Sequence, residues 1–120
     1  MNDTATKATT WDDIQVEKLS DTITRQMLNG ANTTVARILL ARGAVVPPHS
    51  HESEQVSLIL SGALQFVIGG KEILVSGGQM VLIPPHVVHS ARALEDTVDL
   101  DIFSPRREDW IRKDDAYLRG

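Results

Sequence analysis

The 120-residue chain contains no cysteine, and aromatic residues make up only 4 % of it. The lack of cysteine excludes disulfides, thiolate metal sites, iron–sulfur clusters and cysteine nucleophiles. Because aromatic side chains are scarce, aliphatic side chains must fill most of the core. Hydrophobic residues reach 42 %, which is enough to form such a core and argues against disorder. A chain of this length is typical of a single domain.

Long apolar runs and clusters of basic residues are also missing. Stretches such as Met80–Ile83 fall far short of the ~20 apolar residues of a membrane span. The Thr- and Ala-rich residues 1–10 lack the apolar segment of a signal peptide. The chain has 12 Lys and Arg residues against 16 Asp and Glu, without the clustered cations that bind phosphates. We therefore expect a cytoplasmic protein that binds neither nucleic acid nor membrane.

Short apolar stretches separated by turn residues predict an all-β fold. The strongest local signal is Gly69-Gly70, which joins two such stretches and suits a hairpin turn with positive φ at both central residues. A flexible tail over residues 1–10 and one domain over residues 11–120 are expected. A short helical turn over Arg106–Ile111 is expected after Ser104-Pro105. The predicted strands are 33–41, 55–60, 64–68, 71–75, 80–83, 86–93 and 97–103.

All four histidines fall between positions 49 and 89. His49 and His51 are two residues apart, so on an extended chain both rings point to the same side. Gln55 follows at the start of a predicted strand, and His89 lies just after two prolines. Three imidazoles and one amide oxygen suit a divalent first-row metal. By itself, however, an H-x-H pair is more often a feature of a surface loop than of a metal site.

The residues around these histidines resemble the two sequence motifs of the cupin family. The first is Gly43–Gly62 (GAVVPPHSHESEQVSLILSG), and the second is Gly78–Ala93 (GQMVLIPPHVVHSARA). This resemblance implies a small antiparallel jelly-roll barrel that holds a metal ion inside, with His49, His51, Gln55 and His89 as its ligands. Three positions depart from the motifs. They are Gln55 in place of Glu, His86 in place of Gly, and Ala93 in place of Asn.

The fourth ligand position has acidic alternatives nearby in Glu52 and Glu54. Glu54 comes one residue too early for the motif and points to the opposite face of a regular strand, so Gln55 is the favoured ligand. His86 could support a metal ligand, contact a substrate or simply form a turn, and the last role is the favoured one. With only neutral ligands, a bound Ni, Zn, Fe, Mn or Co ion keeps both charges, and one charge unit contributes ~4 kcal/mol toward an anion at an effective dielectric near 20.

The predicted strand 97–103 alternates between two kinds of side chain. Val98, Leu100 and Ile102 share one face, which we expect to pack between the sheets. Asp99, Asp101 and Phe103 share the other face, which meets either water or the barrel cavity. An exposed Phe103 would be unfavourable, and this favours the cavity.

The pattern Asp-x-Phe-Ser-Pro-x-Arg-x-Asp-Trp, running from Asp101 to Trp110, is similar to that of the KdgF-like cupins of pectin and alginate breakdown. This resemblance implies ring opening of 4,5-unsaturated monouronates to linear 5-keto-4-deoxyuronates. It makes Asp101 the catalytic acid/base and places Phe103 and Arg107 in the pocket. Arg107 is expected to act in catalysis by pairing in two-pronged geometry with the carboxylate of a small anionic sugar.

The same resemblance suggests a homodimer, in which the segments around Ile14–Val16 and Ile23–Leu28 pair across a barrel edge. Two other functions stay open at this point. One is a metal cupin of different chemistry, such as a dioxygenase or a lyase acting on a small carboxylate. The other is a cupin that binds a sugar or metabolite without catalysis.

Overall fold

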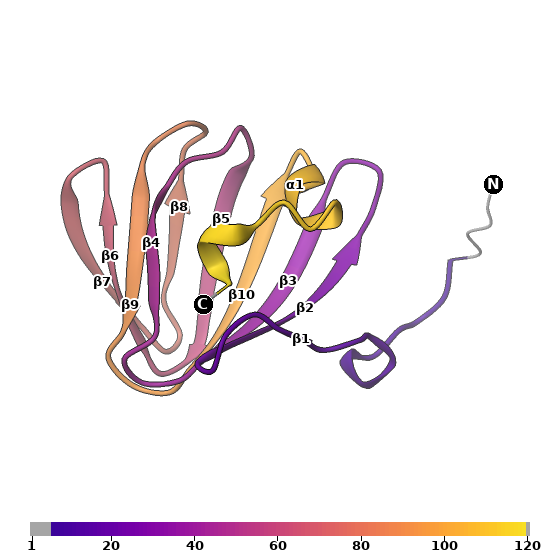
Figure 1. Ribbon diagram of the computed structural model, residues 1–120, viewed down its shortest axis with the longest axis horizontal. Coiled ribbons are helices and arrows are strands. Elements are labelled where there is room, and N and C mark those ends of the chain that lie inside the picture. Colours follow the sequence, from indigo (N-terminus) through magenta and orange to yellow (C-terminus); the bar gives the residue numbers. More distant parts are fainter. Residues whose placement is uncertain (1–5, 120) are drawn as a thin grey trace.

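The computed structural model describes residues 6–119, which form two antiparallel β-sheets packed face to face (Figure 1). The larger sheet has the strand order β1-β2-β3-β10-β5-β8 and the smaller the order β4-β9-β6-β7. The predicted all-β jelly-roll architecture is therefore confirmed. The larger sheet consists of β1 (Glu17–Lys18), β2 (Ile23–Asn29), β3 (Thr34–Leu40), β10 (Thr97–Ser104), β5 (Glu54–Ser61) and β8 (Met80–Ile83). The smaller consists of β4 (Val45–His49), β9 (His89–Ala93), β6 (Ala63–Ile68) and β7 (Lys71–Ser76).

The seven strands predicted from the sequence are all present, with their ends shifted by a few residues at most. Gly69 and Gly70 connect β6 to β7 with φ values of 56° and 82°, which confirms the predicted hairpin turn. Gly62 has a φ of 91°, and a Cβ atom there would lie 2.4 Å from the Asp96 carbonyl oxygen, so only glycine fits.

The ends of the chain differ in part from what the sequence suggests. Residues 1–5 of the predicted tail lie outside the described part, and residues 6–10 are exposed and form neither helix nor strand. Three short helical segments complete the fold, namely η1 (Trp11–Asp13), α1 (Glu108–Ile111) and η2 (Ala116–Leu118). The helix α1 thus begins at Glu108 rather than at the predicted Arg106. None of the helices within residues 6–119 has the length and apolar character needed to cross a bilayer.

The segment Ile23–Leu28, expected to pair with a second copy, belongs instead to a strand of the chain's own sheet. It pairs along its whole length with β3, and β1 covers part of its other edge. The other predicted edge segment, Ile14–Val16, forms no strand. The strand β1 pairs only with Thr24 and Arg25, so the rest of that edge of β2 has no strand partner among residues 6–119. The edge-to-edge arrangement stays a prediction.

The strand β10 lies inside the larger sheet, between β3 and β5. Asp99, Asp101 and Phe103 are buried on its inner face, which settles the choice between water and cavity. Val98, Leu100 and Ile102 are half-buried on the outer face, so the expectation that they pack between the two sheets is wrong. The inner face of β10 lines a cavity that contains a polar site. For this reason β10 has carboxylates on its inner face and aliphatic side chains on its outer face, the opposite of the usual arrangement.

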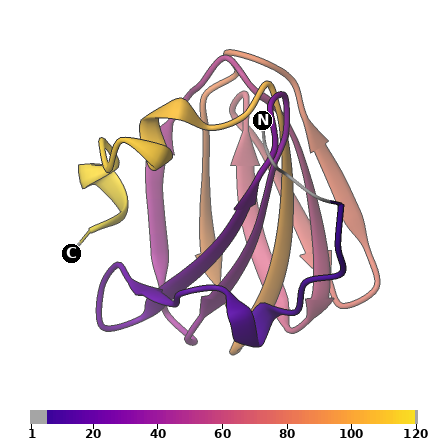
Figure 2. The same ribbon diagram turned by 90° about the vertical axis from the view of Figure 1, so that its right-hand side faces the viewer.

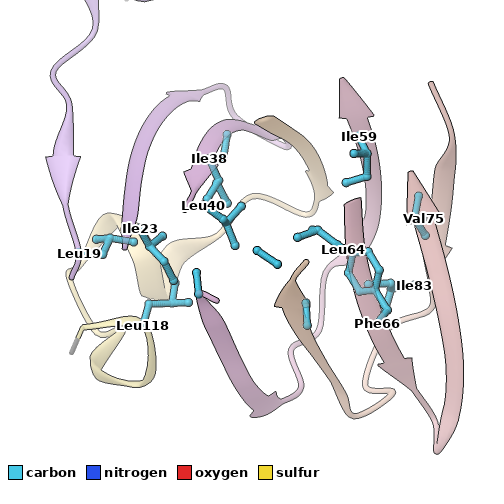
Figure 3. Close-up of a cluster of buried hydrophobic side chains, with 14 of the residues drawn as sticks. Leu19, Ile23, Ile38, Leu40, Ile59, Leu64, Phe66, Val75, Ile83 and Leu118 are labelled. Carbon is cyan, nitrogen blue, oxygen red and sulfur yellow. The ribbon is translucent and has the colours of Figure 1, made fainter. Parts of the chain in front are cut away.

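The apolar core is formed by both sheets (Figure 3). Leu19, Ile23 and Leu118 gather at one end of it, and residues such as Phe66 and Val75 at the other. The C-terminal segment from α1 to η2 leaves β10 and runs along one side of the sandwich (Figure 2). Its Trp110 and Leu118 are buried, so this segment completes the wall of the interior.

Candidate metal centre and its cavity

Three histidines converge at one end of the cavity. His49 ends β4 and His89 begins β9, and the two are register partners in the smaller sheet. His51 lies in the loop that leads to β5. One ring nitrogen of each lies within 4.8 Å of the others. The predicted grouping of His49, His51 and His89 is thus present in the structure.

His86 does not belong to this group, as the sequence suggests. Its backbone N–H donates to the carbonyl of His51 over 2.8 Å, its side chain is exposed, and its φ is +66°. Such a positive φ favours glycine, which explains why the cupin motif has glycine at this position. His86 is a turn residue in a left-handed conformation.

Hydrogen bonds fix the tautomers of the three clustered histidines. Each ring places its Nδ1 atom 2.8–2.9 Å from a backbone carbonyl oxygen, which can only accept, so Nδ1 carries the proton. Burial lowers the pKa of His49 and of His51 to about 4, and it also lowers the pKa of His89. The rings are therefore neutral near pH 7, and each keeps a free lone pair on Nε2. The three carbonyls belong to Pro47, Ser53 and Val87.

Gln55 is buried on β5, and a short hydrogen-bond chain fixes the orientation of its amide. Ser57 Oγ donates to Asp101 Oδ1 over 2.6 Å, so this hydroxyl has no second hydrogen and must accept from Gln55 Nε2, 2.9 Å away. The Gln55 Oε1 atom then faces His51 Nε2 at 3.0 Å. Two acceptors without a proton between them thus point at each other.

This donor set fits a divalent metal ion. The facing acceptors of His51 and Gln55 need a cation between them, and the buried Nε2 atom of His89 has no hydrogen-bond partner within residues 6–119. The hydrogen bonds from Nδ1 to backbone carbonyls fix the orientation of the rings, as such bonds do for histidines that bind a metal. Glu52 and Glu54 are both exposed, which favours Gln55 over either as the fourth ligand.

Asp101 is buried beside this cluster. It forms a pair with Asp99, which lies two residues earlier on the same face of β10. Burial raises the pKa of both carboxyls. For Asp101, hydrogen bonds from Asp99 and Ser57 and the charge of Arg107 act in the opposite direction. Because the two residues lie two apart on one strand, both carboxyls enter the cavity from the inner face of β10.

Arg107 lines the cavity, but the pair of N–H donors that could bind a carboxylate in two-pronged geometry is already occupied. Its Nε and Nη2 atoms donate to the two carboxylate oxygens of Asp109 over 3.0 and 2.8 Å. The guanidinium lies 4.8 Å from the ring centre of Phe103 and 4.1 Å from that of Trp110. The expected two-pronged contact with a substrate is therefore not available. Only Nη1, buried and without a partner in the described part of the chain, is left for an anion.

Tyr117 is a site residue that the sequence does not reveal. Its ring lies 4.5 Å from the His49 ring, and its hydroxyl accepts hydrogen bonds from Arg107 Nη2 and Trp110 Nε1, both over 3.0 Å. No local pattern marks this role, because it depends on η2 returning to β4.

These groups line one cavity between the sheets. Apolar side chains line it together with three of the metal-ligand candidates and the charged groups. The polar and aromatic lining residues are His49, Gln55, Phe66, His89, Ser90, Asp99, Asp101, Phe103, Arg107, Trp110 and Tyr117.

The fold and these motifs define a class of protein that sequence comparison also identifies. Residues 36–104 match the cupin domain family, and the chain belongs to that family. It is similar to the pectin degradation protein KdgF of Dickeya dadantii (strain 3937), with 27 % identity over 103 residues covering 83 % of this chain and 94 % of the relative.

Two solved structures show the same likeness. The structure of KdgF from Halomonas sp. matches with a TM-score of 0.77 and 30 % identity, covering 82 % of this chain and 93 % of that one. An RmlC-like cupin from Shewanella frigidimarina NCIMB 400 matches with a TM-score of 0.82 and 27 % identity, covering 88 % and 96 %.

Proposed function

We propose that this cupin catalyses the ring opening of 4,5-unsaturated monouronates to linear 5-keto-4-deoxyuronates, within the degradation of polyuronates such as pectin. The similarity to KdgF proteins supports the biological setting. The observation that carries the chemistry is the placement of a buried carboxyl, Asp101, next to a neutral set of metal-ligand candidates in one cavity. A site of this kind suits proton transfer on a small anion.

The substrate is a cyclic enol ether with a hydroxyl at C1 and a carboxylate next to the double bond. Removing the C1 hydroxyl proton forms the C1 carbonyl and breaks the bond between C1 and the ring oxygen. The ring oxygen leaves as an enolate on C5, and protonation at C4 converts this enolate to the ketone. No electrons are gained or lost overall, and one proton moves from the C1 hydroxyl to C4.

Asp101 is the residue that we assign to this proton transfer. Burial raises the pKa of Asp101 toward neutral pH. A carboxyl with such a pKa is better able to take a proton from the C1 hydroxyl and return it at C4. The hydrogen bond from Ser57 fixes one carboxylate oxygen and leaves the other to face the substrate or Asp99.

The other residues bind and orient the substrate. Arg107 Nη1 offers one charge-assisted hydrogen bond to the carboxylate. Phe103, which lines the cavity, supplies an apolar wall for the flat C4=C5 region. A divalent ion held by His49, His51, His89 and Gln55 would supply Lewis acidity toward the carboxylate and the developing C5 enolate.

Product identification tests this proposal against the other cupin chemistries. The protein loaded with a divalent metal is incubated with 4,5-unsaturated galacturonate with and without oxygen, and the products are followed by proton NMR. We expect the linear 5-keto-4-deoxyuronate at the same rate in both atmospheres. A product that appears only with oxygen would indicate a dioxygenase instead, and binding without turnover would indicate a sugar-binding cupin.

A further inference from the structure

The structure places a second carboxyl, Asp99, beside Asp101 in the interior, and the mechanism above leaves this residue without a role. Asp99 is 4 % exposed, as is Asp101, and both lie on the inner face of β10. The register partners of Asp99 on the neighbouring strands are Ile38 and Ile59, so its side chain is flanked by apolar residues. Two negative charges in such a place would each lose hydration and repel each other.

The hydrogen-bond pattern indicates how the pair avoids this cost. Asp101 Oδ1 accepts from Ser57, so this carboxyl has the contacts of an anion. Asp99 Oδ1 is buried and contacts no N–H or O–H donor among residues 6–119. A proton on Asp99, donated to Asp101, satisfies both carboxyls at once.

The charged and titratable groups that face the pair come from four sides. Arg107 lies close enough to act on Asp101 through its charge. The opposite sheet presents His49 and His89 to the same cavity, and η2 presents Tyr117. On the neighbouring strand β5, the inward polar residues Gln55 and Ser57 carry no charge. Arg107 is thus the one cation in this set when the histidines are neutral, and it is already paired with Asp109. The cavity therefore supplies no further cation that would balance a second negative charge on the pair.

We propose that Asp99 and Asp101 share one proton through the neutral pH range, with the proton held on Asp99 and donated to the carboxylate of Asp101. Asp99 is then a positioning residue that keeps Asp101 ionised and correctly oriented. The pair also carries one negative charge instead of two, which lowers its repulsion of an anionic substrate. During the proposed reaction Asp99 retains its proton, and the proton from C1 travels on Asp101 alone.

Infrared spectroscopy tests the shared proton directly and independently of activity. We expect the wild-type protein at pH 7 to show one carbonyl stretch of a protonated carboxyl, which shifts on 13C labelling of aspartate and is absent in Asp99→Asn. The exposed residue Asp21 provides the control, since Asp21→Asn should leave the band unchanged. A wild-type spectrum without such a band at pH 7, or a band retained in folded Asp99→Asn, would overturn the proposal.

The pH profile of turnover tests the positioning role, which rests on the proposed function. An Asn at position 99 still donates a hydrogen bond to Asp101 but cannot lose a proton. Asp99→Asn should therefore keep turnover within about tenfold of wild type and lose the alkaline limb of the profile. Asp99→Leu removes the donor and should move the acid limb to higher pH. Unchanged pH profiles in both variants would refute the role, whereas an inactive wild type that shows the infrared band would refute only the proposed function.

Discussion

At the scale of single residues, Gln55 connects the metal-ligand candidates with the acid/base residue Asp101. Its Oε1 atom faces His51, and its amide nitrogen begins the hydrogen-bond chain through Ser57 to Asp101. The orientation of the metal-ligand candidates and that of the acid/base are therefore linked. A glutamate at position 55 could not donate to Ser57, which gives the departure from the cupin motif a structural consequence.

The histidine cluster leads to a direct prediction about metal content. Replacing His49, His51 or His89 by Ala removes one Nε2 donor and should reduce bound divalent metal to a small fraction of one ion per chain. The measurement is elemental analysis of purified protein after dialysis. His86→Ala is the control and should bind as much metal as the wild type. Stoichiometric metal in the cluster variants would refute the site.

A second residue-level prediction concerns Asp101. Asp101→Asn keeps the size of the side chain but removes the group that exchanges protons, so turnover should fall by about 10²–10⁴. Metal content and the folded state should be retained. Steady-state kinetics together with elemental analysis and circular dichroism would check this. Full activity in this variant would remove Asp101 from the mechanism.

At the scale of elements, the C-terminal segment is held against the larger sheet by buried charges. Arg25 on β2 is 0 % exposed and donates to Asp115 over 2.7 Å and to Glu17 over 3.1 Å. Its guanidinium lies 4.5 Å from the centre of the Trp110 ring, and the guanidinium of Arg107 lies close to the same ring. This link connects β2 to the segment that brings Arg107 and Tyr117 into the cavity.

The Arg25–Asp115 contact should make stability depend on pH. Burial acts to raise the pKa of Asp115, but hydrogen bonds from Arg119 and Arg25 outweigh it and lower the pKa below the usual value. This stabilisation is present above the pKa of unfolded Asp, about 3.9, and is lost as the pH falls through the lower folded pKa. Asp115→Asn should lower the free energy of unfolding at pH 7 by about 3 kcal/mol.

Urea unfolding of wild type and Asp115→Asn at pH 7 and below pH 4 measures this effect. The difference between the two proteins should shrink in acid, because protonation removes the same charge from the wild type. The exposed pair Lys18–Asp21 provides a control, since Asp21→Asn should change stability little at either pH. An equal difference at both pH values would contradict the account.

The sequence predicts most of the strands because apolar stretches and turn residues are local signals. It does not predict β4, in which Pro47 and Pro48 hide the strand pattern, although this strand carries His49. The sequence pattern also predicts that the aliphatic face of β10 is the one between the sheets. The face with Asp99 and Asp101 is buried instead, because it lines the polar cavity. The three histidines and Gln55 follow from motif spacing. The roles of Tyr117 and Ser57 depend on contacts between distant parts of the chain, which no local pattern contains.

At the scale of the whole molecule, the outer face of the larger sheet contains a row of apolar side chains that crosses five strands. This row consists of Leu28, Val35, Ile102, Val56 and Leu82 in register. In the next row, Leu100, Leu58 and Met80 continue the apolar surface, and the polar Arg37 and Gln26 end it toward β2. The outer face of the smaller sheet differs, because Arg92, Gln65 and Glu72 interrupt its apolar residues. Contiguous apolar patches on single-chain proteins rarely exceed a few hundred Å².

We propose that a second copy of the chain covers this face, so that the homodimer forms through sheet faces and not through strand edges. A two-fold axis would bring the same apolar rows together across about 20 Å of sheet width. Leu82→Asp places a charge in this face and should shift the protein toward monomer, measured by light scattering coupled to size-exclusion chromatography. Leu74→Asp, equally exposed on the smaller sheet, is the control. A monomeric wild type, or the same dimer in Leu82→Asp, would contradict the proposal.

The central claim is that this molecule opens the ring of an unsaturated uronate. The most direct test follows the absorbance of the conjugated C4=C5 group of 4,5-unsaturated galacturonate after addition of metal-loaded protein. The account predicts that the absorbance falls faster than in the spontaneous reaction, in proportion to protein concentration, and that Asp101→Asn abolishes most of this acceleration. A decay at the spontaneous rate with folded, metal-loaded wild-type protein would contradict it.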